Sequence, residues 1–297
     1  LTTVTVGIIG ANTADWPLFM AEQEGFLKQQ GLQVNTIVTG SPPNAVDQLA
    51  TGSLDFASDG TDSWVRAVAA HLPVQIVAPE MITDPYTLIV QPSIHSWSDL
   101  KGKTVILGTK TDVTAISFAA MAQAHNMSFD KDFNYVTAGS TNARYAALKS
   151  GQVQAAMLTQ PFDFLAEAQG MHELGTSFQY VPHWMFTAYA VNTKWAATHG
   201  PIIVRFIKAL EEGIQYAYAH PDQAIAVMAK TAHVPEAQAK QAYDLDFKQW
   251  KAFSPNEQVS TADIQAVVDA VVKQGTVKTA PPMDQLFNQS YIQQANG

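Results

Sequence analysis

The sequence lacks cysteine altogether across its 297 residues. This absence excludes disulfide bonds, a cysteine nucleophile and thiolate ligands for a metal. It does not fix the compartment, because a chain without cysteine suits an oxidising envelope as well as the cytosol. Long apolar runs are also missing, and none approaches the ~18 consecutive apolar residues that a membrane-spanning helix needs.

Positive charge is scarce as well. The 17 Lys and Arg residues stand against 26 Asp and Glu residues, which gives a formal net charge of −9. A phosphate-rich partner needs a basic surface, so this balance argues against nucleic acid as a partner. Apolar residues make up 47% of the chain, enough for a substantial core in one large domain or two of ordinary size.

Signatures of catalysis and of metal binding are missing too. The eight histidines do not show the His-x-x-x-His or His-Glu-x-x-His spacing of a metal site, and no Gly-x-Ser-x-Gly elbow occurs. Gly102-Lys103-Thr104 resembles the end of a phosphate-binding loop, but Trp97 stands where the leading glycine is required. We therefore expect no metal, no cofactor and no catalytic residues.

What the sequence does contain is a repeat. Gly40-Ser41 opens a stretch that ends at Ala57, and 99 residues later Gly139-Ser140 opens another that ends at Ala156. Five positions are identical between the copies: Gly, Ser, Leu, Gly and Ala. Each copy predicts a strand, a Gly-Ser loop, a helix, a glycine stop and a second strand, which is one unit of a parallel α/β sheet. Two such units predict two lobes whose equivalent loops face each other across a cleft.

The rest of the chain extends this pattern and then becomes helical. Apolar runs bounded by Gly and Pro predict strands at 4–9, 32–38, 54–57, 74–78, 86–90, 104–107, 134–136, 155–158 and 187–191. Strands that alternate with helices predict mainly parallel sheets. From Pro201 onward, apolar residues spaced by threes and fours predict a series of helices. We expect the polar tail after Pro281-Pro282 to pack loosely.

In open sheets of this kind, ligands bind beyond the carboxyl ends of the strands. The segments that follow strands are therefore expected on one functional rim: 12–16, 40–44, 58–62, 109–114, 139–142 and 160–162.

Several segments, in this order, resemble the periplasmic substrate-binding components of ABC importers, in the group for sulfonates, taurine, nitrate and pyrimidine precursors of thiamine. The segments that carry the resemblance are 19–26 (FMAEQEGF), 49–57 (LATGSLDFA), 100–105 (LKGKTV), 148–156 (LKSGQVQAA) with Pro161, and Val191-Asn192. Together they span roughly residues 4–230. One departure is Gln154, where the group usually has Asp, whereas the first copy keeps Asp55.

The resemblance implies an α/β, two-lobed binding-protein fold of type II, whose lobes close on a ligand and present the closed form to a membrane permease. It implies one lobe of residues 1–85 and 190–297, a second of residues 86–189, and hinges near 84–90 and 186–192. We expect a monomer in the periplasm or another extracytoplasmic space, and a chain that begins at Leu1 fits the loss of a signal segment. We expect binding without chemistry, of an organic acid, a sulfonate or a pyrimidine-like or aromatic compound.

Two other functions stay open. Synthases of the pyrimidine precursor resemble these binders, but they carry a cysteine-rich iron-binding motif, which a chain without cysteine does not have. The other function is a ligand sensor that docks onto a receptor, which the sequence does not separate from a transporter component.

The candidate site consists of polar groups and aromatic rings on the expected rim. Hydroxyls and N–H groups at helix starts suit a carboxylate, sulfonate or phosphate, or else they only cap their own helices. Rings near strand ends suit a planar or aliphatic ligand, or else they pack within a lobe. The expected ligand-binding residues are Asn12, Trp16, Ser41, Asp59, Thr61, Asp62, Tyr86, Thr109, Thr111, Thr114, Ser140, Thr141, Asn142, Arg144, Gln160, Phe162 and Trp184.

The charges on this rim conflict. Arg144, early in the second-copy helix, is either the counter-charge for an anionic ligand or a solvated helix residue. Asp15, Asp59 and Asp62 would repel an anion and favour a ligand with an amine or several donors. Because Pro42-Pro43 stiffens the first copy while the second is more polar, we expect the second lobe to grip the ligand's polar group and the first to shape the pocket.

Overall fold

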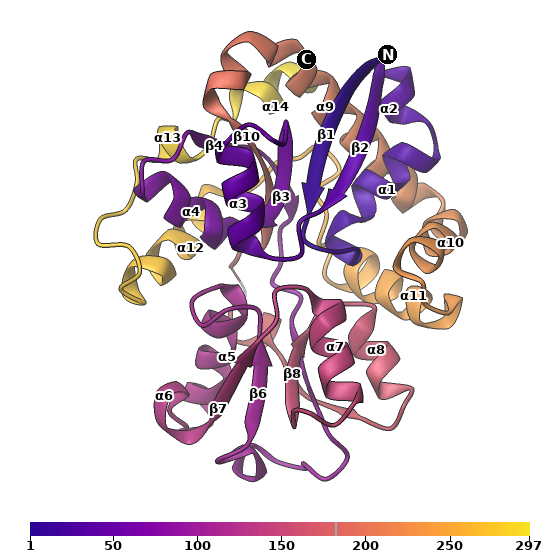
Figure 1. The fold of residues 1–297 in the computed structure, drawn as a ribbon. Helices are drawn as coiled ribbons and strands as arrows, with labels where there is room; N and C mark the ends of the chain where they lie inside the picture. The colour runs from indigo at the N-terminus through magenta and orange to yellow at the C-terminus, as the bar shows by residue number, and fades with distance from the viewer. Residues whose placement is uncertain (182) are drawn as a thin grey trace.

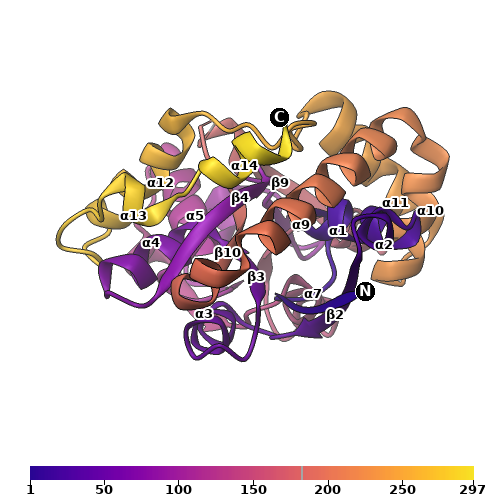
Figure 2. The ribbon, with the colours of Figure 1, turned by 90° about the horizontal axis from the view of Figure 1, so that it is seen from above.

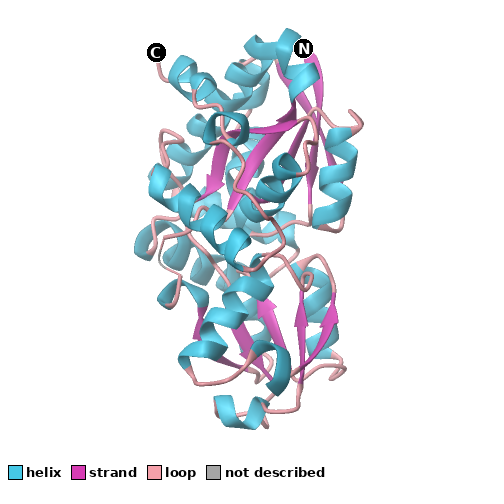
Figure 3. Cartoon of the chain, turned by 90° about the vertical axis from the view of Figure 1, so that its left-hand side faces the viewer, coloured by secondary structure: helices cyan, strands magenta, loops and turns pink. Residues whose placement is uncertain are grey.

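The chain folds into two lobes, one above the other in Figure 1, each built around a five-stranded sheet. The computed structural model describes residues 1–181 and 183–297. Both termini lie on the upper lobe. Seen from the side, helices flank the sheet of each lobe (Figure 3). The predicted two-lobed α/β architecture is confirmed.

The two sheets share one topology. The first has the strand order β2-β1-β3-β10-β4 and the second has the order β7-β6-β8-β5-β9. The strands of the first sheet are β1 (Thr2–Ile8), β2 (Leu32–Val38), β3 (Phe56–Gly60), β4 (Val74–Met81) and β10 (Thr187–Asn192). Those of the second are β5 (Thr87–Val90), β6 (Thr104–Leu107), β7 (Asn134–Thr137), β8 (Ala155–Leu158) and β9 (His172–Thr176).

Helices connect these strands and form the C-terminal part. Around the first sheet lie η1 (Thr13–Asp15), α1 (Trp16–Gln23), α2 (Phe26–Gln29), α3 (Pro42–Ala50) and α4 (Thr61–Ala69). Around the second lie α5 (Val113–Ala124), α6 (Phe129–Asp132), α7 (Thr141–Lys149) and α8 (Phe162–Glu167). The remaining helices are α9 (Thr193–Ala219), α10 (Pro221–Ala232), α11 (Glu236–Tyr243), α12 (Thr261–Lys273), α13 (Met283–Leu286) and α14 (Ser290–Ala295).

The expectation of mainly parallel sheets needs a correction, because both sheets are mixed. β10 pairs antiparallel with β3 and β4, and β5 pairs antiparallel with β8 and β9. These two strands follow the points where the chain crosses from one lobe to the other, so each enters its sheet against the local direction. The other pairings, of β1 with β2 and β3 and of β6 with β7 and β8, are parallel, as the repeated units predict.

The chain therefore changes sheets twice, between Met81 and Thr87 and between Thr176 and Thr187. The predicted boundary at residue 189 falls inside β10, which belongs to the first sheet. The division into two units that move on hinges near 84–90 and 186–192 stays a prediction.

The repeat is also a structural equivalence. In the first copy, Asp55 N donates to Thr5 O (3.0 Å) and Asp55 Oδ2 accepts from Thr5 N (2.8 Å). In the second copy, Gln154 N donates to Thr104 O (3.0 Å) and Gln154 Oε1 accepts from Thr104 N (3.2 Å). An amide oxygen accepts a hydrogen bond where the carboxylate does, so Gln154 preserves the link between neighbouring strands.

The C-terminal part differs from expectation at both ends. α9 begins at Thr193 rather than Pro201, because Asn192 Oδ1 accepts from Lys194 N (3.0 Å) and caps an earlier start. His199 breaks the helical geometry (φ −122°, ψ 18°) directly before the turn that holds Pro201. The tail does not pack loosely: Leu286, Phe287 and Ile292 are buried, and Phe287 bridges to Ile76 of β4. Figure 2 shows α14 lying close to α9 and β4.

Gly213 sits where α9 crosses α1, which makes it a test of this packing. A methyl group on Gly213 would lie 2.7 Å from Pro17 O and 3.0 Å from Ala21 N. Because backbone atoms yield less than side chains, we expect Gly213→Ala to lower the free energy of unfolding by about 1–3 kcal/mol, measured by urea denaturation. Gly200→Ala in the same helix is the control, since its methyl would meet only Tyr291 Cε1 at 3.6 Å. Equal losses in both variants would contradict this account.

Candidate functional site

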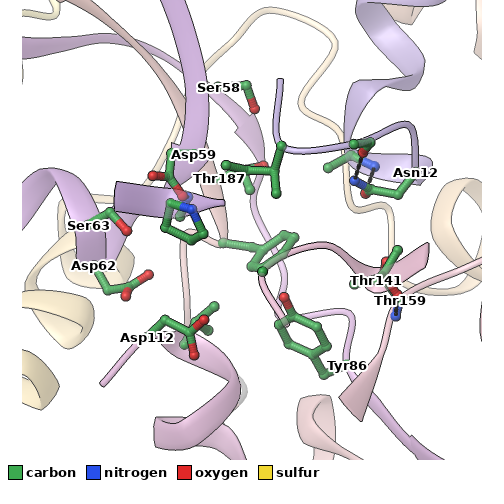
Figure 4. A pocket seen from close by; sticks show the side chains of 18 of the residues that line it. Asn12, Ser58, Asp59, Asp62, Ser63, Tyr86, Asp112, Thr141, Thr159 and Thr187 are labelled. Carbon is green, nitrogen blue, oxygen red and sulfur yellow. Dashed lines mark hydrogen bonds between the residues drawn. The ribbon is translucent and has the colours of Figure 1, made fainter. Parts of the chain in front are cut away.

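A small cavity lies between the two lobes, at the carboxyl ends of the strands. Its volume is about 60 Å³, room for a few water molecules or a small organic group. Figure 4 shows its polar side chains. The lining residues are Ile9, Gly10, Asn12, Ala14, Asp15, Pro42, Ser58, Asp59, Gly60, Asp62, Ser63, Tyr86, Asp112, Val113, Gly139, Thr141, Arg144, Thr159, Phe186 and Thr187.

Strand ends deliver these residues, as the topology of open α/β sheets requires. Ser58, Asp59 and Gly60 form the end of β3, and Asp62 and Ser63 follow at once in the first turn of α4. In the same way η1 follows β1, Asp112 precedes α5, and Thr159 follows β8. Tyr86 comes from the crossing segment between the lobes. The rim predicted from strand ends is thus where the cavity forms.

The duplicated loops meet at this cavity. Gly139 approaches the first copy so closely that a Cβ on it would lie 2.6 Å from Gly40 O and 2.8 Å from Ser41 Cα. Hydrogen bonds also join the lobes: Thr13 N donates to Gln160 O (3.3 Å), and Arg66 Nη1 donates to Thr111 O (2.8 Å). In addition, His183 Nδ1 lies 3.2 Å from Asp263 Oδ1. The structure is therefore a closed arrangement of the lobes.

One side of the cavity is acidic. Asp59, Asp62 and Asp112 lie along it in Figure 4, and we call these three residues the acidic wall. All three are buried, with 2%, 1% and 4% of their surface exposed. Arg66 pairs with Asp62 Oδ2.

Burial and mutual repulsion raise the pKa values of this wall. The pKa of Asp59 is well above its usual range, first because the carboxyl is buried and second because Asp62 lies close to it. The same two causes, in the same order, raise the pKa of Asp112 to about 6. Behind the cavity, burial raises the pKa of Glu80 to about 7, although Ser58 Oγ donates to Glu80 Oε2 (2.5 Å).

The opposite side of the cavity carries neutral polar groups together with one further carboxyl, Asp15, whose Oδ2 accepts from Asn12 N and Nδ2 (3.3 Å each). Asn12, Thr141 and Thr159 lie there, and the Tyr86 hydroxyl points into the space between the two sides (Figure 4). Asn12 caps η1 by accepting from Ala14 N (2.9 Å). Thr141 Oγ1 accepts from Thr159 N (3.1 Å), whereas the buried Thr159 Oγ1 has no hydrogen-bond partner among the described residues.

Arg144 belongs to this second side, but its guanidinium is already engaged. Nε donates to Met157 O (2.7 Å), and Nη1 donates to Gly139 O (2.8 Å) and Ala138 O (3.1 Å). The group also lies over the ring of Tyr86, 5.5 Å from its centroid, and only 1% of the residue is exposed. The expectation of a solvated helix arginine is therefore wrong, because the side chain turns inward and braces the Gly139 loop.

The structure brings only some of the expected ligand-binding residues to the cavity. Those that line it are Asn12, Asp59, Asp62, Tyr86, Thr141 and Arg144. Those that lie outside its lining are Trp16, Ser41, Thr61, Thr109, Thr111, Thr114, Ser140, Asn142, Gln160, Phe162 and Trp184.

Several of the outlying residues have other hydrogen bonds or packing contacts. Trp16 Nε1 donates to Ala224 O (2.8 Å), and its ring packs edge-on against Phe247. Ser140 Oγ accepts from Ala143 N (3.3 Å) and caps α7. Gln160 Nε2 donates to Asp163 Oδ2 (2.8 Å).

Three more of these residues have contacts within the second lobe. Thr109 Oγ1 accepts from Asp112 N (3.0 Å), and Thr114 Oγ1 accepts from Gly108 N (2.8 Å), so both stabilise the loop that presents Asp112. Phe162 packs against Tyr145. For these positions the capping and packing alternatives hold.

Sequence reasoning missed two kinds of lining residue. Ser58, Ser63, Asp112 and Thr159 end or follow strands, and Thr187 begins the antiparallel strand β10. For Ser58, Ser63, Asp112 and Thr159, the position at or after the end of a strand could have identified them. Asp112 lies inside the predicted segment 109–114, where only the hydroxyl residues were selected. The expectation that the second lobe supplies the polar grip is also too narrow, since Asp59 and Asp62 come from the first lobe.

Two features are absent from the part of the chain that the structure describes. No group of three or more histidine, aspartate or glutamate side chains is arranged to hold a metal ion. No described helix combines the length and the apolar character needed to cross a membrane.

The raised pKa values predict an unusual pH dependence of stability. Asp59, Glu80, Asp84 and Asp112 bind protons more tightly when folded, with a pKa of about 7 for Glu80 and about 6 for Asp84 and Asp112. The folded state therefore holds more protons between pH ~4 and ~7, and the free energy of unfolding falls as pH rises through that window. We expect the free energy of unfolding to fall by up to about 1.4 kcal/mol per group and pH unit in this window, and the ligand-free protein therefore to melt at a higher temperature at pH ~5 than at pH ~8.

Arg66 lowers the pKa of Asp59 and Arg144 lowers that of Asp112, but burial and Asp62 outweigh both. Asp59 and Asp112 face Asp62, and Glu80 lies near Asp15 and Tyr189. Asp244→Asn serves as a control, because lysines lower the pKa of this exposed carboxyl and its titration falls below the window. A melting temperature that rises steadily from pH ~5 to ~8 would contradict the prediction.

Comparison with known proteins gives a match to one family model and to several relatives. The model of the family described as NMT1/THI5 like matches residues 12–224. A protein of Brucella abortus, named as a presumed binding protein, is 27% identical over 222 residues, 73% of this chain and 68% of that protein. YtlA of Bacillus subtilis, with the same kind of name, is 24% identical over 306 residues, 97% of this chain and 88% of that protein. The pyrimidine phosphate synthase THI11 of Saccharomyces cerevisiae is 25% identical over only 43% of this chain and 38% of its own.

Solved structures share the fold along nearly the whole chain. The ligand-binding component of an ABC-type import system from Staphylococcus aureus superposes with a TM-score of 0.83 at 14% identity, covering 99% of both chains. The alkanesulfonate-binding protein SsuA of Xanthomonas axonopodis gives 0.77 at 18% identity, covering 97% of this chain and 98% of that one. The desulfurization enzyme DszB gives 0.73 at 12% identity, covering 100% and 99%. These likenesses confirm the binding-protein fold.

Proposed function

The chain belongs to the NMT1/THI5-like family, and from that membership we propose that it is the solute-binding component of an ABC import system. It captures a small organic molecule between its lobes and carries out no chemistry on it. The observation that carries this proposal is the enclosed cavity at which the duplicated loops of the two lobes meet, lined by buried polar atoms from both.

The proposal includes a cycle of opening and closure. A cavity of about 60 Å³ whose walls touch at Gly139 and Gly40 gives a solute no wide entrance, so the lobes separate to admit it and close around it. The lobes are residues 1–85 with 190–297 and residues 86–189, and the crossing segments near 84–90 and 186–192 are the hinges. A ligand that contacts both lobes binds the closed form better and shifts the population towards it.

The proposal also names the partner protein and the cellular compartment. The closed form docks onto a membrane permease, and the protein works as a monomer outside the cytoplasm. Family membership and the named import component among the structural neighbours support this setting.

A catalytic function is the main rival, because the fold is shared with DszB and part of the sequence with a pyrimidine phosphate synthase. The cavity residues do not favour it: the zero cysteine count removes a thiol nucleophile. The candidate base Asp112 accepts hydrogen bonds from Thr109, Thr114 and Ala115, so it serves to cap α5 and hold its own loop. A solute sensor that docks onto a receptor would use the same closure.

Native mass spectrometry of the purified protein tests the proposal directly, because a bound solute travels with the protein. A thermal-shift panel of alkanesulfonates, carboxylates, aromatic acids, amines and pyrimidines follows. A solute at ~100 times its dissociation constant stabilises the protein by about 2.7 kcal/mol. The proposal expects one intact solute with such a shift. The absence of any bound mass and any shift would overturn it, and so would conversion of the solute by the protein alone.

A further inference from the structure

The acidic wall brings together carboxylates from three separate parts of the chain. Asp59 ends β3, Asp62 lies in the first turn of α4, and Asp112 precedes α5 of the other lobe. Three buried carboxylates at one side of a small cavity repel one another, since each has lost the water that would screen it. An arrangement of this kind is unfavourable unless something at the cavity compensates for it.

The hydrogen bonds within the wall leave two oxygens free. Asp59 Oδ1 accepts from Gly60 N (2.6 Å), and Asp62 Oδ2 accepts from Arg66. The second oxygens, Asp59 Oδ2 and Asp62 Oδ1, are buried and have no partner among the described residues. Buried polar atoms normally have a partner, so two neighbouring acceptors without one indicate donors that arrive with a ligand.

Asp112 contributes charge rather than a free oxygen. Its Oδ2 accepts from Thr109 N (2.8 Å), and its Oδ1 accepts from the Thr114 hydroxyl (2.5 Å). These bonds fix its orientation at the cavity.

The protein's own cations do not neutralise this side. Arg66 is the cation paired with the wall, one guanidinium for three carboxylates. Arg144 also lines the cavity, and its charge lowers the pKa of Asp112, but its Nε and Nη1 donate to three backbone carbonyl oxygens. With Arg66, it gives two guanidinium groups against the four lining carboxyls of Asp15, Asp59, Asp62 and Asp112. A purely anionic ligand would therefore meet repulsion from the wall.

Taking the proposed solute-binding function as given, we propose that the acidic wall holds a cationic nitrogen with at least two N–H donors, as in a protonated amine or an amidinium, and that this group decides which solutes bind. The two free oxygens accept one N–H each, and Asp112 adds attraction from the other lobe. Because the wall contains residues of both lobes, the cation also draws the lobes together. The opposite side, which carries Thr159, receives the remainder of the solute.

Probes of matched size separate charge from shape. Acetamidine and ethylamine are the cationic probes, and propionate and ethanesulfonate are the anionic ones. We expect the two cations to raise the melting temperature in a saturable way and the two anions to leave it unchanged. A saturable shift from ethanesulfonate or propionate without one from either cation would overturn the inference.

The carboxamide variants Asp59→Asn and Asp62→Asn give the second test. Each keeps the shape of the side chain and removes one charge, so acetamidine affinity measured by calorimetry should fall about tenfold or more. Removing a carboxylate from a repelling cluster should at the same time raise the melting temperature of the ligand-free protein at pH ~8. Asp47→Asn, at an exposed position of α3, is the control and should change neither quantity.

The opposite directions of these two effects distinguish ligand contact from a structural role. If Asp59→Asn lowers affinity and stability together, the residue only supports the fold and the inference fails. The broader function fails separately: a saturable shift with an anion alone leaves solute binding intact, whereas no bound mass and no shift with any compound removes both.

Discussion

Replacing Arg144 with methionine is expected to lower the free energy of unfolding by about 3–5 kcal/mol. Three backbone carbonyls, those of Met157, Ala138 and Gly139, accept hydrogen bonds from the guanidinium at 2.7–3.1 Å. Methionine fills a similar length but donates nothing, so these buried oxygens lose their partners. Denaturant unfolding of the ligand-free protein measures the loss, and its size should not depend on whether an anion is present.

Lys149→Met provides the matched control for this prediction. Lys149 ends the same helix, α7, and its Nζ lies 5.9 Å from the Tyr145 ring centre at an exposed position. Exposed cation–π contacts contribute about 0.5–1 kcal/mol, so its replacement should cost no more than that. If Arg144→Met lowers the free energy of unfolding as little as Lys149→Met does, Arg144 does not stabilise the Gly139 loop. The hypothesis that Arg144 is the counter-charge for an anionic ligand would then be favoured.

The order of the elements could be predicted from the sequence because local signals determine it. Apolar runs that end at glycine or proline mark strands such as 4–9 and 104–107, and the repeat of Gly40-Ser41 at Gly139-Ser140 marks equivalent units. The direction of β5 and β10 could not be predicted from periodicity, which is the same for a strand in either direction. Their direction follows from the crossing between lobes, a long-range property.

The position of the cavity was easier to predict from the sequence than the identity of the residues that line it. Strand ends must gather at one edge, and the cavity lies at that edge. The choice among residues on the rim depends on which side chains already have partners, and that depends on tertiary contacts. Trp16 was selected for its ring and is fixed by Ala224 O, whereas Asp112 was passed over although its neighbours Thr109 and Thr114 serve to hold it.

The conflict of charges in the sequence has a physical explanation in the structure. Asp59, Asp62 and Asp112 lie along one side of the cavity, and Asp59 Oδ2 and Asp62 Oδ1 have no hydrogen-bond partner among the described residues. The arginine supports the Gly139 loop, and this loop closes the cavity against Gly40 and Ser41. A role in closure and a role in recognition are thus divided between the two kinds of charge.

Replacing Gly139 with alanine is expected to hold the lobes apart. The added methyl carbon would lie 2.6 Å from Gly40 O and 2.8 Å from Ser41 Cα, both backbone atoms of the facing loop. Overpacking of this kind costs about 1–3 kcal/mol, and opening on the hinge relieves it. The cost therefore falls on the closed form, and acetamidine or any co-purified solute should bind about 5- to 150-fold more weakly.

Small-angle X-ray scattering measures the change of shape, since an opened pair of lobes has a larger radius of gyration than a closed pair. The few polar links between the lobes, such as Arg66 to Thr111, oppose the opening by less than the clash drives it. Gly200→Ala, whose methyl meets only Tyr291 at 3.6 Å, should scatter like the unchanged protein. A Gly139→Ala protein with unchanged scattering and unchanged affinity would mean that the contact between the duplicated loops does not limit closure.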